Sequence, residues 1–261
     1  MTYPLVSIIT PLYNCESHIH DTVLSVIKQT YPHWELLLVD DCSTDSSLTI
    51  ALQYANDDQR IRVIRMTTNS GAAVARNAAI KEAEGQFIAF LDSDDLWLPH
   101  KLEKQLDFMH QKNCALSFSA YQKIDERGKD LGVVGVPETV SHQELLKTCV
   151  IGCLTAMYDS QKIGKVYMPL IRKRQDFGLW LSILKKIDVA YGIFEPLAQY
   201  RVRRDSISAN KLKAAQYTWH LFRHVEQLSL IKSGYYFVHY ACRGVLRTKF
   251  PRLARSLNVL H

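Results

Sequence analysis

Uninterrupted apolar runs alternate with segments of helical periodicity through the first half of the chain. Runs rich in Val, Ile and Leu fit buried strands, whereas apolar residues three and four positions apart fit helices with one buried face. We expect strands at residues 5–10, 35–39, 61–65 and 87–91. Helical segments separate them, at residues 19–27, 44–56 and 72–83. This alternation predicts an α/β fold with a doubly wound, parallel sheet.

Polar or conformationally special residues follow each predicted strand. They occupy residues 11–13, Asp41, residues 69–71 and residues 92–94. The carboxyl ends of parallel strands meet at one edge of the sheet, where open α/β sheets bind their ligands. We therefore expect a nucleotide-type ligand at this edge.

The second half of the chain is less regular. An amphipathic helix is predicted at residues 98–109, with Pro99 in its first turn. Ser141 and Glu144 have the spacing of a capping box that opens a short helix. The other predicted elements are a strand at 115–121, a hairpin turn at 125–130 leading into 131–136, a helix from Asp176 to Leu184, a strand at 189–200 and a helical remainder.

Three carboxylates, Asp92, Asp94 and Asp95, lie within four residues where the fourth apolar run ends. Like charges this close repel one another, and a bound cation would offset the repulsion. Carboxylate oxygens suit Mg²⁺ or Mn²⁺, which commonly bridge to a substrate diphosphate. The alternative is an acidic loop between strand and helix in which Asp95 caps the helix.

Composition adds limits on size and setting. The chain has 261 residues, 47% of them hydrophobic, which suits one large α/β domain with an appended segment. No apolar run is long enough to cross a membrane, and the first residues lack the basic start of a signal peptide. Six cysteines without metal-type spacing favour reduced thiols and a cytoplasmic location.

The net charge of +6 is distributed unevenly. Residues 201–261 hold twelve Lys and Arg against two acidic residues, whereas residues 1–200 hold 20 basic and 24 acidic residues. An acidic body therefore precedes a basic end.

Five motifs, in order, resemble the family-2 glycosyltransferases with the GT-A fold. They are residues 6–14 (VSIITPLYN), 39–45 (VDDCSTD), 69–71 with 75–77 (NSG and ARN), 91–95 (LDSDD) and 175–181 (QDFGLWL). The resemblance covers roughly residues 4–210 and implies a Rossmann-like, mostly parallel sheet with helices on both faces. It divides the chain into a catalytic domain at 1–209, with a nucleotide-binding half (1–97) and an acceptor half (98–209), and a basic, aromatic helical segment at 210–261.

The resemblance implies a nucleotide-sugar site at the carboxyl edge. Pro11 and Tyr13 would line the base pocket, and Asp41 would accept the N3–H of uracil, a proton that cytosine lacks. A UDP-sugar, or else a dTDP-sugar, is the implied donor. The other implied nucleotide-binding residues are Asn14, Asn69, Gly71, Arg76, Asp92, Ser93 and Arg203. A helix cap for Asp41 and a turn requirement for Gly71 are the simpler interpretations.

The same resemblance assigns the reaction chemistry. Asp94 would hold the Mn²⁺ or Mg²⁺ that offsets charge on the departing nucleotide. Asp176 would be the base that takes the acceptor hydroxyl's proton in a single, inverting displacement. The alternative for Asp176 is an acid at a helix N-terminus, stabilised by the helix dipole.

Two positions depart from the family pattern. Many relatives carry Glu where this chain has Gln175, and a His where it has Arg203. Arginine cannot ligate a metal but can bind phosphate oxygens in bidentate fashion. We therefore expect Arg203 to contact the donor diphosphate.

The implied function is transfer of one sugar from a nucleotide-sugar to a hydroxyl of a glycan or lipid-linked glycan, in bacterial surface polysaccharide synthesis. A dehydrogenase is excluded because Gly-x-Gly-x-x-Gly is missing after the first strand. A sugar nucleotidyltransferase is the first alternative, although its usual glycine-rich, basic loop is also missing there. The second alternative is a catalytically silent binding protein with the same fold.

The segment 210–261 combines basic and aromatic residues, which favours contact with an anionic membrane. The protein would then be peripheral on the inner face of the plasma membrane. Trp219, Phe222 and Val225 sit at helical spacing, so packing on the catalytic domain or in a homodimer is the alternative. No recognised motif supports nucleic-acid binding.

Overall fold

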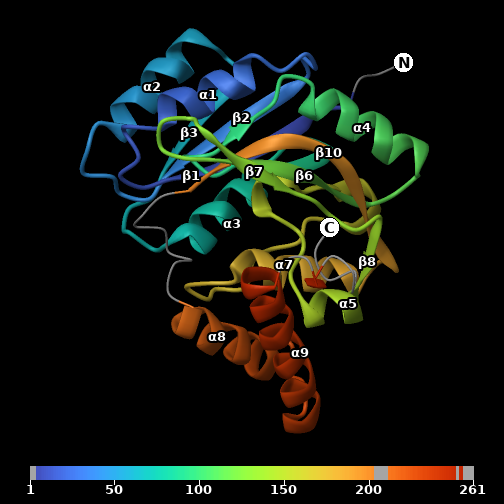
Figure 1. Cartoon of the computed structure of the whole chain (residues 1–261). Helices are drawn as coiled ribbons and strands as arrows, with labels where there is room; N and C mark the ends of the chain where they lie inside the picture. Colours follow the sequence, from blue (N-terminus) through green and yellow to red (C-terminus); the bar gives the residue numbers. More distant parts are fainter. Residues whose placement is uncertain (1–3, 203–210, 251–252, 255–261) are drawn as a thin grey trace.

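The computed structural model describes residues 4–202, 211–250 and 253–254 (Figure 1). Arg203, the expected diphosphate contact, lies outside the described residues. The strands are β1 (Val6–Leu12), β2 (Trp34–Asp40), β3 (Ile61–Arg65), β4 (Phe87–Phe90), β5 (Leu96–Trp97), β6 (Leu116–Ile124), β7 (Asp130–Val134), β8 (Thr139–Ser141), β9 (Met157–Asp159) and β10 (Val189–Arg201). The helices are α1 (Ile19–Ile27), α2 (Ser47–Asp57), α3 (Ala72–Glu82), α4 (Lys101–Gln111), α5 (His142–Lys147), α6 (Ser160–Ile163), α7 (Gln175–Leu184), α8 (Lys211–His220) and α9 (Leu230–Lys249).

The first half of the chain forms the parallel part of the sheet. The strand order β3-β2-β1-β4 is parallel throughout, and α1, α2 and α3 connect these strands, as the alternating pattern predicts. β1 runs two residues beyond the predicted strand, since Pro11 pairs with Val39 and Leu12 with Asp40. The carboxyl ends of β1, β2 and β4 therefore lie side by side at one edge.

The second half completes a mixed sheet. β9 joins β4 and β6 by antiparallel pairing, β10 runs parallel to β6, and β5 closes the order antiparallel to β10. β7 pairs antiparallel with β6, which confirms the predicted hairpin. The long strand β10 is bulged between Ile193 and Ala198, and this bulge accommodates Pro196.

Two hydrophobic cores cover the two faces of the sheet. Alternate residues of a strand point to opposite faces, so Ile8 of β1 lies in one core and Ile9 in the other. The first core packs α1, α2 and α4 on the sheet, and the second packs α3 and α7 on the opposite face (Figure 1). This arrangement confirms the predicted helices on both faces.

One local prediction near a helix start was wrong, and one alternative interpretation there is excluded. Leu96 and Trp97 pair with β10 as β5, so the helix begins only at Lys101 and Pro99 precedes it. Asp95 does not cap that helix, because it is buried beneath β10. The predicted capping box is confirmed: Ser141 Oγ accepts from Glu144 N while Glu144 Oε2 accepts from Ser141 N.

The C-terminal segment packs on the catalytic fold through its aromatic side chains. A π-helical turn, Leu221–Val225, follows α8, and its Phe222 is fully buried against Phe177 of α7. Trp219 of α8 meets Phe237 of α9 edge to face. The segment is therefore helical, as predicted, and packing on the catalytic fold accounts for one of its faces.

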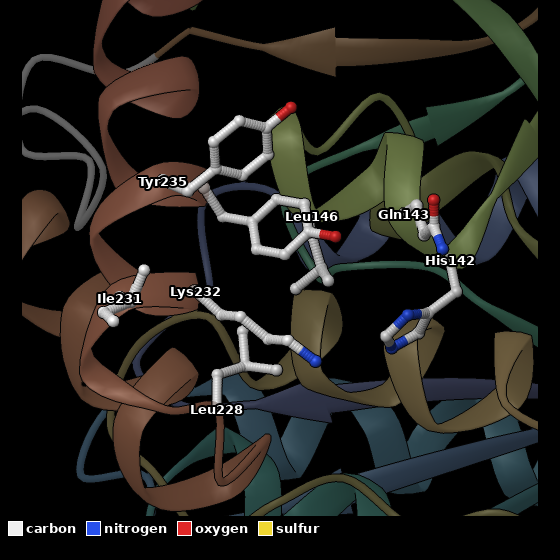
Figure 2. Close-up of a pocket in the computed structure, with 8 residues that line it drawn as sticks. His142, Gln143, Leu146, Leu228, Ile231, Lys232 and Tyr235 are labelled. Atoms are coloured by element: carbon white, nitrogen blue, oxygen red, sulfur yellow. The ribbon is translucent and has the colours of Figure 1, made fainter.

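A groove of about 420 Å³ lies between α5 and the first half of α9 (Figure 2). It is lined by His142, Gln143, Leu146, Leu228, Ile231, Lys232, Tyr235 and Tyr236. Among the helices that the structure describes, none has both the length and the apolarity to cross a membrane.

Candidate active site

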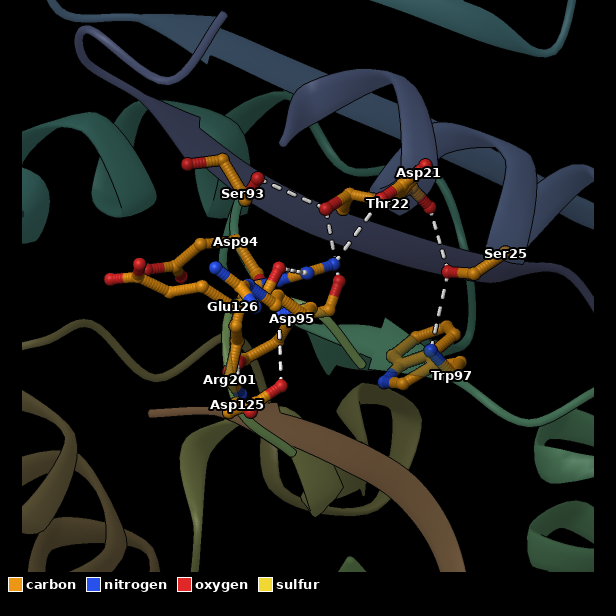
Figure 3. Close-up of polar contacts among 11 residues, drawn as sticks. Asp21, Thr22, Ser25, Ser93, Asp94, Asp95, Trp97, Asp125, Glu126 and Arg201 are labelled. Atoms are coloured by element: carbon orange, nitrogen blue, oxygen red, sulfur yellow. Dashed lines mark hydrogen bonds and ion pairs between the residues drawn. The ribbon is translucent and has the colours of Figure 1, made fainter. Parts of the chain in front are cut away.

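The backbone of the acidic loop after β4 is held in place by hydrogen bonds to α1 and within the loop itself. Thr22 Oγ1 of α1 donates to the carbonyl oxygens of Ser93 at 3.0 Å and Asp95 at 2.9 Å (Figure 3). Asp95 N donates to Asp92 O at 3.1 Å, which closes a tight turn. Because the backbone is held in this way, the side chains of Asp92, Ser93 and Asp94 remain partly exposed at the carboxyl edge.

Arg201, the last residue of β10, fixes the same loop from the other side. Its backbone N–H donates to Asp95 Oδ1 at 2.9 Å, and its Nε donates to the carbonyl oxygen of Asp94 at 3.0 Å (Figure 3). Its guanidinium also reaches Asp21 Oδ2 at 3.3 Å. This arginine was missed from sequence, because it precedes Arg203 in a basic run and nothing in the pattern separates the two.

Negative charge accumulates on the acidic loop. Burial raises the pKa of Asp95 well above its ordinary value, and the charges of Asp92 and Asp94 raise it further, against a smaller lowering by Arg201. A divalent cation at the loop would relieve this repulsion. Within the described residues no three His, Cys, Asp or Glu side chains are arranged to hold a metal ion, so the protein would supply only one or two carboxylates. That number fits Mg²⁺ or Mn²⁺, which take their remaining ligands from substrate phosphates and water.

Arg76 of α3 holds Asp92 in an ion pair. The guanidinium is almost fully buried, and its Nη2 donates to Asp92 Oδ1. Burial lowers the pKa of Arg76, but Asp92, Cys153 and Asp176 together outweigh it and the net shift is upward. Gln175, with its amide oxygen facing the guanidinium, accepts from Arg76 Nη1 at 3.1 Å. Arg76 thus links the acidic loop to the start of α7.

The loop between β3 and α3 is anchored on Asp41. This carboxylate, only 3% exposed, accepts from Ser70 N at 2.8 Å and from Gly71 N at 2.7 Å. Asn69 Nδ2 donates in turn to the carbonyl oxygen of Asp41 at 2.9 Å. Gly71 has a φ of +88°, in the left-handed region that favours glycine, and it begins α3. Asp41 is therefore not a side-chain cap of α2, which begins after Ser46.

The residues after β1 face the same edge. Asn14, also in the left-handed region, has its Oδ1 accepting from Thr44 N at 2.9 Å, while its own N–H donates to Ser43 Oγ at 3.2 Å. These bonds join the loops after β1 and β2. Tyr13 beside them is 53% exposed, so its ring is available for stacking on a planar ligand.

Asp176 lies in the first turn of α7, as predicted, and is half-buried. Arg174 immediately before the helix has a φ of +68°, and its guanidinium carbon lies 5.4 Å from the centroid of the Tyr240 ring of α9. Phe177 also stacks on Tyr240, with ring centroids 6.3 Å apart. The start of α7 thus packs against the C-terminal helix.

The Arg76 guanidinium connects the donor edge to the segment that carries Asp176. It pairs with Asp92, and its Nη1 donates at 3.1 Å to the amide oxygen of Gln175, the residue before Asp176. The two carboxylates predicted for opposite ends of the reaction therefore lie on segments that one arginine joins. Burial raises the pKa of the Cys153 thiol well above its usual value, Arg76 opposes the rise, and Asp92, Asp176 and Asp95 add to it. Cys153 itself was missed, because it begins a single 3₁₀ turn (Cys153–Thr155) with no motif around it.

α9 also partly buries a cation against the catalytic fold. Burial lowers the pKa of Arg247, and the remaining influences come from Cys149, Arg243, Tyr121 and Tyr240. Tyr240 lies about one turn beyond the groove residue Tyr236, and Arg247 lies about two turns beyond Tyr240. Neither was predicted as a site residue, because only the tertiary packing brings Tyr240 against Phe177 and partly buries Arg247.

The sequence matches a known family over more than half of its length. A profile described as glycosyl transferase family 2 matches residues 7–147. The chain belongs to this family. A Bacillus subtilis (strain 168) protein named for teichuronic acid biosynthesis, the glycosyltransferase TuaG, is 50% identical over 243 residues, covering 93% of this chain and 96% of that protein. The Escherichia coli UDP-Glc:alpha-D-GlcNAc-diphosphoundecaprenol beta-1,3-glucosyltransferase WfgD is 38% identical over 247 residues, covering 94% of this chain and 96% of that enzyme.

Solved structures share the GT-A fold. Staphylococcus aureus TarS (residues 1–349) in complex with UDP-GlcNAc superposes with a TM-score of 0.69 at 21% identity, covering 97% of this chain and 79% of that one. The Pyrobaculum calidifontis mannosyltransferase PcManGT in complex with GDP-Man and Mn²⁺ gives a TM-score of 0.68 at 15% identity, covering 99% and 80%. The family match and the fold together identify the chain as a glycosyltransferase and not as a sugar nucleotidyltransferase.

Proposed function

We propose that this glycosyltransferase moves one sugar from a UDP-sugar to a hydroxyl of a lipid-linked glycan, with inversion, during synthesis of a bacterial surface polysaccharide. The observation that carries the proposal is the link through Arg76. Its guanidinium pairs with Asp92 on the donor side and donates to Gln175, the residue before the acceptor-side Asp176. Relatives named for teichuronic acid synthesis and for a UDP-Glc-dependent transfer support the choice of donor and pathway.

The nucleotide would lie along the carboxyl edge. The exposed ring of Tyr13 suits stacking on a base, beside Pro11 and the loop that Asp41 anchors. A carboxylate has about four lone-pair positions, so two backbone hydrogen bonds still leave Asp41 able to accept the uracil N3–H. Asn14, Asn69, Gly71 and Ser93 are the remaining contacts proposed along the described part of this edge.

A divalent cation would be held by Asp94, with Asp92 close to the ribose and fixed by Arg76. When bound, such an ion acts as a Lewis acid that stabilises negative charge on the nucleoside diphosphate. The chain itself keeps the acidic loop in place through hydrogen bonds from Thr22 of α1 and Arg201 of β10. A rigid, negatively charged loop costs little reorganisation when the donor arrives.

Asp176 would act as the base. The acceptor oxygen attacks the anomeric carbon while its proton passes to the Asp176 carboxylate, and the bond from that carbon to the nucleotide's phosphate oxygen breaks. One displacement inverts the anomeric centre. In the alternative interpretation, Asp176 only stabilises the start of α7. Its replacement would then have little effect on the transfer rate.

With a lipid-linked acceptor, the enzyme would work at the inner face of the plasma membrane, as a peripheral protein. The WfgD relative is named for an acceptor that carries a diphosphate and a polyprenol. Such an acceptor keeps its lipid in the bilayer, so the enzyme would meet it at the membrane surface.

The direct test is donor hydrolysis over a panel of UDP-, dTDP- and GDP-sugars with Mn²⁺, Mg²⁺ or EDTA. We expect turnover with one or more UDP-sugars and a divalent cation, and loss of turnover in EDTA. Calorimetry with UDP plus Mn²⁺, compared with Mn²⁺ alone, separates an enzyme's donor site from a silent binding protein. Absence of UDP binding in the presence of Mn²⁺ would contradict the proposal.

A further inference from the structure

α9 has two faces of different character. One face is buried on the protein: Ser233 is fully buried, Tyr236 packs on Phe222, and Tyr240 stacks on Phe177. These residues recur every three or four positions and so follow one side of the helix. The opposite side therefore points away from the catalytic fold.

That outward face is apolar. Its residues, which we call the α9 stripe, are Ile231, Tyr235, Val238, Cys242 and Val245, spaced four, three, four and three apart. Ile231 is 86% exposed and Val238 is 60% exposed. Phe250 and Leu253, beyond the end of the helix, are exposed as well. A continuous exposed apolar stripe of this length is unusual unless it contacts another apolar surface.

The stripe continues into the groove between α5 and α9. Ile231 and Tyr235 belong to both, so the two form one surface (Figure 2). The groove's lining is mostly apolar, and the Lys232 side chain extends across it toward His142. An apolar surface bordered by a cation matches the boundary between lipid chains and phosphate headgroups.

The basic charge of the C-terminal segment favours a membrane over a second copy of the chain as the partner of the α9 stripe. From residue 227 to the end, the sequence holds six Lys or Arg and no acidic residue; of these, Arg247 is half-buried, whereas Lys232 and Lys249 of α9 are exposed. A second copy docked on the stripe would bring two such basic segments together, and like charges at an interface are unfavourable. An anionic bilayer supplies the opposite charge and the apolar surface together.

We propose that the α9 stripe and its adjoining groove dock the enzyme on anionic phospholipid. This docking specifies the face by which the peripheral enzyme proposed above meets its membrane. Tyr240 on the inner side of the same helix lies beside the start of α7, so a docked α9 holds Asp176 close to the bilayer that carries the acceptor. The transfer chemistry is independent of the docking, and the two can fail separately.

The test is sedimentation of the full chain with vesicles of phosphatidylglycerol and phosphatidylcholine, compared with pure phosphatidylcholine. Deletion of residues 210–261 is unsuitable, because it would remove the buried Phe222. We use instead the double variant Ile231→Gln and Val238→Gln, since Gln retains good helix propensity. Val133→Gln is the matched control, because Val133 of β7 is 57% exposed, close to the 60% of Val238.

We expect the wild type and the control to sediment with anionic vesicles at low salt and to be released at high salt, because salt screens the attraction. The double variant should bind at least tenfold more weakly while its thermal unfolding and UDP binding stay unchanged. Wild-type protein that ignores anionic vesicles at low salt, or a double variant that binds like the control, overturns the proposal. A dimer in solution that the double variant converts to monomers also overturns it, by assigning the stripe to a second copy.

Discussion

Replacing Asp41 with Asn tests whether this residue holds the loop, the nucleotide base, or both. The substitution keeps the shape of the side chain but exchanges one carboxylate oxygen for an amide N–H₂. In the structure both oxygens accept from backbone donors, Ser70 N at 2.8 Å and Gly71 N at 2.7 Å. One of these donors would then face another donor inside a site that is 3% exposed.

The magnitude follows from these two bonds. A hydrogen bond to a charged group contributes about 1.5–3 kcal/mol. Asp41→Asn loses one such bond and weakens the other, so we expect the free energy of unfolding to fall by about 2–4 kcal/mol. For a chain of this size that corresponds to a decrease in Tm of about 5–10 °C. If the carboxylate also accepts the uracil N3–H, UDP affinity should fall by a further 1–3 kcal/mol, about 5- to 150-fold.

The assay combines thermal unfolding without ligand and calorimetric titration with UDP and Mn²⁺ below the lowered Tm. Ser70→Ala is the control, since it removes only the hydroxyl that bonds Thr68 and leaves the Ser70 backbone N–H donating to the Asp41 carboxylate. An unchanged Tm would refute the anchoring role read from the geometry. A lowered Tm with unchanged UDP affinity would move the base contact to another residue.

Four further substitutions test the rest of the molecule. Asp94→Ala should abolish metal-dependent transfer while leaving the fold intact by circular dichroism; near-normal transfer in EDTA would show that the metal assignment is wrong. Asp176→Asn should bind donor normally and lose roughly 10²–10⁴-fold in transfer rate, and a loss under tenfold would mean that another group takes the proton. Phe222→Ala should cost about 3–5 kcal/mol of unfolding free energy in denaturant titration, because Phe222 is fully buried against Phe177. Burial raises the pKa of Glu226, but His142 and Lys185 together outweigh burial and the net shift is downward. The stability that ionised Glu226 adds is therefore present above its ordinary pKa and lost as the pH falls. Glu226→Gln should flatten the acid side of a Tm–pH curve between about pH 6 and pH 3.

The parallel half of the sheet could be predicted because its strands are continuous apolar runs. Residues 35–39 and 87–91 contain almost nothing else, as buried parallel strands require, and both are strands in the structure. The short β5 could not be predicted, since two residues give no periodicity. Its pairing with β10 depends on a strand about a hundred residues later, which no local pattern reports.

In the candidate active site, too, some residues could be predicted from sequence and others could not. Asp94 and Asp176 carry motifs and could be named from sequence. Arg201 and Cys153 carry none, because their roles come from long-range contacts: Arg201 N meets Asp95 Oδ1 across more than a hundred residues. Sequence motifs therefore identify candidate reacting groups, whereas the residues that position the loops can be found only in the folded chain.

Gln175 shows how a departure from a family pattern acquires a physical reason once the packing is known. Its amide oxygen accepts from Arg76 Nη1 at 3.1 Å, while its amide nitrogen donates to the carbonyl oxygens of Ile171 at 3.1 Å and Arg172 at 3.2 Å. A glutamate at this position could accept from Arg76, but an ionised carboxylate has no proton to donate to the two carbonyls. Glutamine alone satisfies both sides, so in this chain the loop before α7 is tied to the same arginine that holds Asp92. The residue that looks like a lost carboxylate is thus the link by which the donor edge and the segment carrying Asp176 keep a fixed relation.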